Sequence, residues 1–430
     1  MGIAARVINA AVQVLSVALT VRYLGSERYG LWVNLLVVAI WTGLSNFGLG
    51  AALVSKIANA DGAGQQVRAR RLISSATAAV TVLSAILLLA FLAAWPLVPW
   101  HSIFGLSSPS LWREADWGVL VCVTLILITL PFRLGEPILN GYQRGYLVNA
   151  CYIVGTIASF IGLLIGVQFQ VNIPLLVLFT LGLQLSGTIL GWYLTCRLGL
   201  AAFRFSDVNW KDVRETVFSG GLFFLLQIYL LVPQTMTLVI ANQLGSASVT
   251  PFAVTQRLFF IIISIVNTCA APLWPAFGEA ASRGDTHWVR KIFHRAIWLT
   301  ATLWVAMAVG LAPFGKQLIN LWSGLDAVPS TPLLLFIMFF ALFQSLQIVL
   351  SMFLNGLGIL RVQVIAGGLT AVVQVVGGFL AASRWGVSGV AAVQCGATGL
   401  IALPILFISA QRALRTLAHN APCTPTLTKL

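Results

Sequence analysis

The chain has 430 residues, of which 59% are hydrophobic and 8% charged, and its mean hydropathy is +0.94. A soluble domain carries about 25% charged residues, so the composition excludes a water-soluble enzyme or binding module. It also excludes a porin-like barrel, whose strands alternate apolar and polar residues. The composition therefore predicts an all-α polytopic membrane protein.

Long runs without charged residues place the predicted helices. One membrane crossing needs about 20 residues, and the longest runs exceed this length, so each of those contains two helices or one helix and a loop. Breaks at charged residues, proline and glycine predict twelve transmembrane helices, at residues 3–22, 30–54, 72–95, 116–139, 146–167, 173–195, 215–241, 251–277, 295–314, 331–355, 362–383 and 387–410.

The charge distribution predicts the orientation. Lys and Arg number 25 against 11 acidic residues, a net charge of +14. With the N-terminus inside, most of the basic residues lie in the predicted cytoplasmic segments, which is the bias expected for membrane insertion. The sequence therefore predicts that both termini are cytoplasmic. It also predicts that the positive charge serves insertion and not the binding of nucleic acid.

The two halves of the chain resemble each other. The triplet Leu-Gly-Ser at residues 24–26 recurs at 244–246, and Leu-Asn-Gly at 139–141 recurs at 354–356. We therefore predict an N-terminal six-helix lobe over 1–205, a C-terminal six-helix lobe over 206–412 and a cytoplasmic tail over 413–430. An even number of helices per repeat makes the repeats parallel. Transporters with this symmetry bind their substrate at a central cavity.

Polar residues line one face of several predicted helices. Side chains three, four and seven residues apart share a face of a helix, and an unpaired amide in hydrocarbon costs several kcal/mol. The stripes therefore predict a wet central cavity whose amides bind the hydroxyl groups of a carbohydrate, although interhelical hydrogen bonds explain single residues equally well. The amide candidates are Asn34, Gln227, Gln234, Asn267 and Gln344.

Two predicted spans carry charged residues. Arg133 and Glu136 lie in the fourth helix, either as a mutually neutralising pair or as cavity residues, and Arg257 lies in the eighth helix without a helix-local acidic partner. A central charge costs about 2.5–3.5 kcal/mol on insertion scales. Arginine offers forked, charge-assisted donors that suit a diphosphate. A contact with lipid headgroups or a structural role is the alternative for Arg257.

The sequence carries none of the common cofactor or metal motifs. The six cysteines show no C-x-x-C spacing, the four histidines are scattered, and no phosphate-binding GxxxxGK loop occurs. Catalytic metal sites and ATPases need such clusters. The sequence therefore predicts neither a cofactor nor a metal site.

Three segments resemble a known family. They are Arg-Tyr-Leu-Gly-Ser-Glu-Arg-Tyr-Gly-Leu-Trp at 22–32, Asn-Phe-Gly-Leu-Gly at 46–50 and Ala-Val-Thr-Gln-Arg-Leu at 253–258. The sequence is similar to Wzx-type polysaccharide-biosynthesis flippases of the multidrug/oligosaccharidyl-lipid/polysaccharide (MOP) exporter superfamily. The resemblance implies two six-helix lobes around a V-shaped cavity, with Arg257, Arg22 and Arg28 in cavity roles.

The same resemblance implies a function and a location. Such a protein moves a polyprenyl-diphosphate-linked oligosaccharide, an O-antigen, capsule or exopolysaccharide repeat unit, from the cytoplasmic to the periplasmic leaflet of the bacterial inner membrane by alternating access. Partners would include the lipid-linked oligosaccharide, membrane lipids and other polysaccharide-assembly proteins. Glu136 is the candidate for coupling the outward step to protons.

Three other functions remain open at this point. A cation-coupled multidrug exporter of the same superfamily needs several membrane carboxylates, and the predicted spans offer Glu136 with Asp116 at an outer edge. A lipid II flippase usually has two more helices. A membrane glycosyltransferase or polymerase needs catalytic acids on large outer loops, and the longest predicted outer loop holds Glu114 alone before Asp116. We therefore predict a transporter and not an enzyme.

Overall fold

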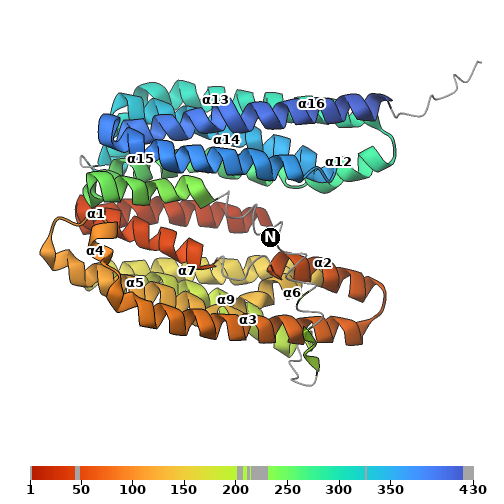
Figure 1. Ribbon diagram of the computed structural model, residues 1–430, viewed down its shortest axis with the longest axis horizontal. Helices are drawn as coiled ribbons and strands as arrows, with labels where there is room; N and C mark the ends of the chain where they lie inside the picture. Colours follow the sequence, from red (N-terminus) through yellow and green to blue (C-terminus); the bar gives the residue numbers. More distant parts are fainter. Residues whose placement is uncertain are drawn as a thin grey trace, which may run out of the picture. The chain divides into compact units, whose positions relative to one another are not determined.

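The computed structural model describes residues 2–43, 49–200, 207–210, 214, 231–324 and 327–419. This described part consists of helices and connecting turns, without a β-strand. The chain divides into two compact units, Met1–Thr250 and Pro251–Leu430 (Figure 1). The lobe boundary predicted at 205/206 lies outside the described residues, as does most of the predicted tail.

The described residues of the first unit form the helices α1 to α9 and one further helix. Short 3₁₀ turns lie at Trp95–Leu97, Pro131–Leu134 and Ser246–Ser248, and a π-helical turn lies at Leu178–Gly182. The helices are α1 (Gly2–Gly43), α2 (Leu49–Gly62), α3 (Gln66–Ala94), α4 (Trp100–Ile103), α5 (Pro109–Thr129), α6 (Gly135–Gly141), α7 (Gly145–Gln168), α8 (Ile173–Val177), α9 (Leu183–Arg197) and a helix over residues 231–244.

The second unit consists of long helices with a π-helical turn at Thr398–Ala402. They are α11 (Val249–Ala270), α12 (Leu273–Ser282), α13 (Thr286–Ser323), α14 (Thr331–Gly356), α15 (Arg361–Ala397) and α16 (Leu403–His419). Over the described chain, seven helices are long and apolar enough to cross a membrane, or eight if the bent pair α5 and α6 counts as one span.

Eleven described residues have positive φ, and each lies between two predicted helices. Ten of them form five pairs whose members are 220, 220, 219, 215 and 216 residues apart. The pairs are Gly25 and Gly245, Gly64 and Gly284, Gly105 and Gly324, Gln143 and Gly358, and Gln170 and Gly386. The break at Gly25 lies inside α1, and the break at Gly386 lies inside α15. The backbone therefore repeats with the offsets of the sequence triplets.

Helix ends differ from the predicted ones for identifiable reasons. The helix predicted over 116–139 is bent by 46° between α5 and α6, because Pro131 cannot donate a backbone hydrogen bond and its ring clashes with the preceding turn. The helix predicted over 251–277 is interrupted near Pro272 for the same reason. The helix predicted over 295–314 extends over Thr286–Ser323, because Arg and Lys are good helix formers outside the membrane.

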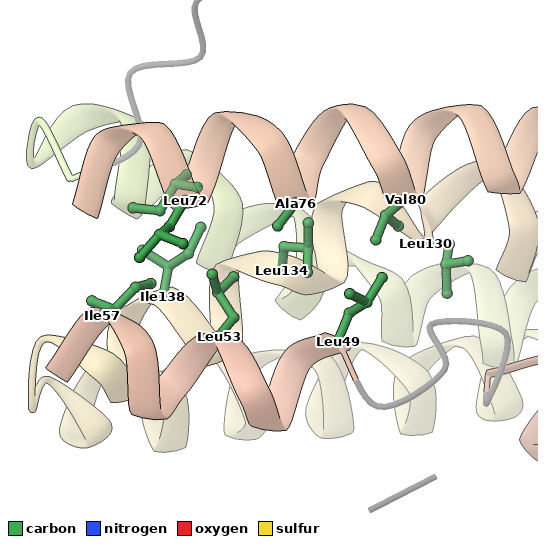
Figure 2. Close-up of a cluster of buried hydrophobic side chains, with 10 residues drawn as sticks. Leu49, Leu53, Ile57, Leu72, Ala76, Val80, Leu130, Leu134 and Ile138 are labelled. Atoms are coloured by element: carbon green, nitrogen blue, oxygen red, sulfur yellow. The ribbon is translucent and has the colours of Figure 1, made fainter. Parts of the chain in front are cut away.

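The core of each unit explains the repeated Asn-Gly pair. In the first unit, leucine, isoleucine and valine side chains of α2, α3 and the α5–α6 segment form one buried cluster (Figure 2). A Cβ at Gly141 would lie 2.8 Å from Cβ of Ile57. In the second unit, a Cβ at Gly356 would lie 2.8 Å from Cβ of Phe277. Glycine is therefore needed where α6 crosses α2 in the first unit and where α14 crosses α12 in the second.

Candidate functional site

Arg257 lies on a face of α11 that does not pack into the second unit. The buried residues of α11 include Leu258, Ile262 and Val266, and the last two belong to a cluster with Val349 of α14. Arg257 is half-buried, and Ser264, seven residues later on the same face of α11, is exposed. Within the described part of the chain, its guanidinium forms no ion pair and no hydrogen bond. This arrangement leaves its donors available to an anionic ligand.

A buried amide network fixes α11 next to Arg257. Gln256 Nε2 donates to Oε1 of Gln394 at 3.3 Å. Gln374 Nε2 donates to Thr398 Oγ1 at 3.1 Å, and Thr398 Oγ1 donates to the carbonyl oxygen of Gln394 at 2.9 Å. Gln394 is fully buried, at 0% exposure. Sequence analysis did not select Gln394, although an amide in an apolar helix is a usable signal because it must find a partner.

Arg28 is paired with an acidic residue that sequence analysis did not assign to it. Its Nη2 donates to Oε1 and Oε2 of Glu114 at 3.0 and 2.8 Å. Glu114 Oε2 also accepts from the backbone N–H of Ile173 at 3.0 Å. The pair connects α1, α5 and α8 within the first unit. Arg22, one turn before the break at Gly25, is exposed.

Arg133 and Glu136 lie where the predicted fourth span bends. Arg133 belongs to the 3₁₀ turn Pro131–Leu134 and is half-buried, whereas Glu136 is exposed in the first turn of α6. Their side chains form no ion pair with each other or with any other described residue. The direct pair that sequence analysis left open is thus absent from this part of the structure.

The five candidate amides lie in different environments. Asn34 is fully buried, and neither its Oδ1 nor its Nδ2 has a hydrogen-bond partner among the described residues. Gln234 and Gln344 are half-buried, and Asn267 is exposed. Gln227 lies outside the described residues. In α14 the buried Oε1 of Gln347, which is not among these five candidates, also lacks a described partner.

Comparison with known proteins decides the family. The family model described as polysaccharide biosynthesis protein matches residues 2–281, more than half of the chain. The chain belongs to the polysaccharide biosynthesis protein family. A second model, MatE, matches residues 223–380 of this family member.

One curated relative and two solved structures are similar to this chain, the structures in their fold. The relative, from Salmonella typhimurium (strain LT2), is named "Putative O-antigen transporter" and is 20% identical over 319 residues, 73% of this chain and 72% of its own. An inward-facing multidrug resistance MATE family transporter of the MOP superfamily matches with a TM-score of 0.81 at 16% identity, covering 96% of each chain. The lipid II flippase MurJ matches with a TM-score of 0.72 at 16% identity, covering 97% of this chain and 89% of its own. The predicted all-α, multi-pass membrane fold is confirmed.

Proposed function

We propose that this protein is a flippase that moves a polyprenyl-diphosphate-linked oligosaccharide from the cytoplasmic to the periplasmic leaflet of the bacterial inner membrane. The match to the polysaccharide biosynthesis family over residues 2–281 is the observation that carries the proposal. The similarity to a protein named as an O-antigen transporter supports the same substrate class.

The proposed mechanism is alternating access, in which the substrate site faces one leaflet and then the other. Arg257 binds the diphosphate, because its guanidinium is half-buried and has no described partner. Amides such as Gln344 bind sugar hydroxyl groups, and the polyprenyl tail stays in lipid. Arg28 contributes to this site less directly, because Glu114 already neutralises it.

The proposal includes the orientation and the partners. Both termini lie in the cytoplasm, as the distribution of Lys and Arg predicts. The substrate is made on that side and used on the other. The flippase therefore works between the enzymes that assemble the repeat unit and those that polymerise it, and other polysaccharide-assembly proteins are its proposed partners.

A cation-coupled multidrug exporter is the second candidate, because the MatE model matches residues 223–380. Exporters of this kind need carboxylates to bind cations. Glu114 is engaged with Arg28, and Glu27 accepts hydrogen bonds from Ser107 and Ser108. Among the described residues, the carboxylates within predicted spans are then Glu136 and, at an outer edge, Asp116, and so small a number favours the flippase.

The test is a strain that lacks the gene, in which surface polysaccharide and lipid-linked oligosaccharide at the inner leaflet are both measured. We expect the first to be lost and the second to accumulate. Wild type and Arg257→Lys should restore export, and Arg257→Ala should restore it poorly. Arg412→Ala is the matched control, because Arg412 is exposed in α16. Normal polysaccharide with reduced dye efflux would instead identify an exporter, and a defect in cell-wall synthesis would identify a lipid II flippase.

A further inference from the structure

Most of the long helix α13 is not covered by other parts of the second unit. Of its 38 residues, six are buried. The helix runs along one edge of the second unit, where it packs against α14 and α16 (Figure 1). Trp298, Val305 and Val309 on its open side are 72%, 51% and 71% exposed. This side of α13 therefore faces whatever surrounds the protein.

The open side of α13 carries a stripe of residues whose chemistry changes along the helix. Five of them are spaced by three, four, seven and four positions, so they share one face. They are Lys291, His294, Trp298, Val305 and Val309, and the exposed residues Arg290 and Arg295 flank the charged end. The stripe begins with cations, passes through an indole and ends in aliphatic side chains. We call these seven residues the α13 stripe.

The cations of the α13 stripe are not neutralised by described residues. Within the part of the chain that the structure describes, the side chains of its Arg and Lys residues form no ion pair and no hydrogen bond. Two acidic residues lie nearby in the sequence, and both are engaged elsewhere. Glu279 pairs with Arg283, and Asp285 accepts from the backbone N–H of Trp288 at 2.9 Å. The positive charge is therefore available to an anion from outside the chain.

The order of side chains in the stripe matches the order of chemical groups in a phospholipid. Trp298 lies seven residues beyond Lys291, or about 10 Å along the helix. Tryptophan is enriched where the headgroups of a membrane meet its hydrocarbon, so Trp298 marks that boundary. A phosphate held by Lys291 and Arg295 has its glycerol beside Trp298 and its acyl chains beside Val305 and Val309. A water-soluble anion would leave the indole and both valines uncovered.

Membrane insertion alone does not explain the α13 stripe. The bias toward Lys and Arg on one side of the membrane requires basic residues but no particular helix face. The first half repeats the basic pair of the stripe at 70–71, but with the same offset of 220 Arg295 and Trp298 correspond to Ser75 and Ala78. Ser75 is 1% exposed, so this position of α3 packs inside the first unit. The exposed order of cation, indole and aliphatic residues belongs to α13 and not to its counterpart α3.

We propose that the α13 stripe binds an anionic phospholipid of the surrounding membrane. Lys291 and Arg295, one turn apart, hold the phosphate, because basic residues at a membrane surface attract acidic headgroups and a guanidinium matches phosphate oxygens in its geometry. Trp298 packs on the glycerol region, and the acyl chains cover the two valines. The site lies on a different helix from Arg257, and it does not depend on which substrate the protein transports.

Native mass spectrometry of the purified full-length protein in detergent tests this site. Dioleoyl phosphatidylglycerol and dioleoyl phosphatidylcholine have the same acyl chains and differ in the net charge of the headgroup, so the ratio of their dissociation constants isolates the effect of that charge. The site variant is Lys291→Gln with Arg295→Gln. The matched control is Arg412→Gln with Arg415→Gln, which removes the same charge from two exposed residues of α16. These arginines lie at the same end of the second unit, where Ala413 belongs to one buried cluster with Phe293.

We expect wild type to prefer phosphatidylglycerol. The site variant should lose about twenty-five-fold in affinity for this lipid, because each basic residue beside an acidic headgroup contributes about a factor of five. The control should lose less than about threefold, because charges farther from the phosphate are screened. Binding of phosphatidylcholine should change in neither variant, which also shows that both are folded. Trp298→Ala should weaken the binding of both lipids alike, because it removes an apolar contact that they share.

Four results would overturn the lipid site. An equal loss of affinity in the control would show diffuse attraction, and equal affinity of wild type for the two lipids would show that the stripe does not select charge. Displacement of phosphatidylglycerol by an equal concentration of glycerol 3-phosphate would identify an anion site that needs no membrane. A dimer that dissociates in the site variant would assign this face of α13 to a second copy of the chain.

Discussion

Removing the carboxylate of Glu114 should destabilise the first unit more than its surface position suggests. Glu114 accepts two hydrogen bonds from Nη2 of Arg28 and one from the backbone N–H of Ile173. The Glu114→Ala variant loses all three. It also leaves the half-buried guanidinium of Arg28 without the carboxylate that pairs with it, and the neighbouring Glu27 is engaged with Ser107 and Ser108. The perturbation therefore creates an orphaned charge as well as removing an attraction.

The magnitude follows from the exposure of the two side chains. Breaking a fully buried ion pair costs about 3–5 kcal/mol, and an exposed pair contributes about 0–1 kcal/mol. The Arg28 and Glu114 side chains are 33% and 21% exposed, which places the cost of Glu114→Ala at about 2–3 kcal/mol between those limits. Glu114→Gln should cost about half as much, because its amide oxygen still accepts hydrogen bonds.

A double-mutant cycle on Arg28 and Glu114 measures the pair directly. Unfolding in mixed detergent micelles, followed by tryptophan fluorescence, should give a coupling free energy of about 1.5–2.5 kcal/mol. The matched control is the pair Glu279 and Arg283, which lies 2.5 Å apart but is 63% and 74% exposed. Its coupling should be about 0.3–0.5 kcal/mol, as for other exposed pairs four residues apart on a helix.

Two results would refute this reasoning. If the coupling of Arg28 with Glu114 is no larger than that of Glu279 with Arg283, the pair is not a structural element of the first unit. If the double variant Arg28→Ala/Glu114→Ala folds as well as wild type but exports no polysaccharide, Arg28 acts on the substrate and not on the scaffold. We expect the double variant to be more stable than Glu114→Ala, because it contains no orphaned guanidinium.

Two further predictions concern the second unit. Gly356→Ala should lower the free energy of unfolding by about 1–3 kcal/mol through overpacking against Phe277, whereas Gly368→Ala, where a Cβ meets no atom within 4 Å, should raise it by up to about 1 kcal/mol; the same micelle assay ranks them, and equal effects would contradict the steric argument. Gln394→Leu should cost about 1–3 kcal/mol, because the amide of Gln256 loses its acceptor. It should also reduce polysaccharide export when assayed in the deletion strain, and full export would separate this network from the substrate site.

The sequence was sufficient to locate most of the described long helices because the membrane imposes one strong constraint. Backbone groups in hydrocarbon must be satisfied within a helix, so apolar runs and their breaks predict spans. Hydropathy does not report where a helix ends outside the membrane, and α13 therefore begins nine residues before its predicted start. It also does not report the angle of a bend, such as the 46° between α5 and α6.

The candidate site was less predictable because partners are distant in the chain. Arg257 could be selected because a charge in an apolar run is conspicuous. The partner of Arg28 lies 86 residues away on another helix, and no local pattern connects the two. For Asn34 the residue type and the helix face could be predicted. Whether the Asn34 amide has a hydrogen-bond partner depends on how the helices pack, and the sequence does not report this.

The two halves of the chain share their backbone breaks but not the charged residues of the candidate site, and this difference bears on function. Positive-φ breaks recur with offsets near 220, and so does the basic pair at 70–71, which returns at 290–291, but the charged residues of the candidate site do not recur. With that offset Arg257 corresponds to Val37, which is 4% exposed, and Arg28 corresponds to Ser248. Glu114 falls on the apolar pair Leu333 and Leu334, which are both buried.

A symmetric scaffold with unshared charges suits an asymmetric ligand. The repeated breaks set where the helices of both halves end and bend. If Arg257 binds the diphosphate as proposed, its presence in one half alone gives the transport path a single anion-binding point. A polyprenyl-diphosphate-linked oligosaccharide has one doubly charged group between a neutral glycan and a hydrocarbon tail, and so it needs one such point. Val37→Arg with Arg257→Val would move the charge to the other half, and export should then fail even though the net charge is unchanged.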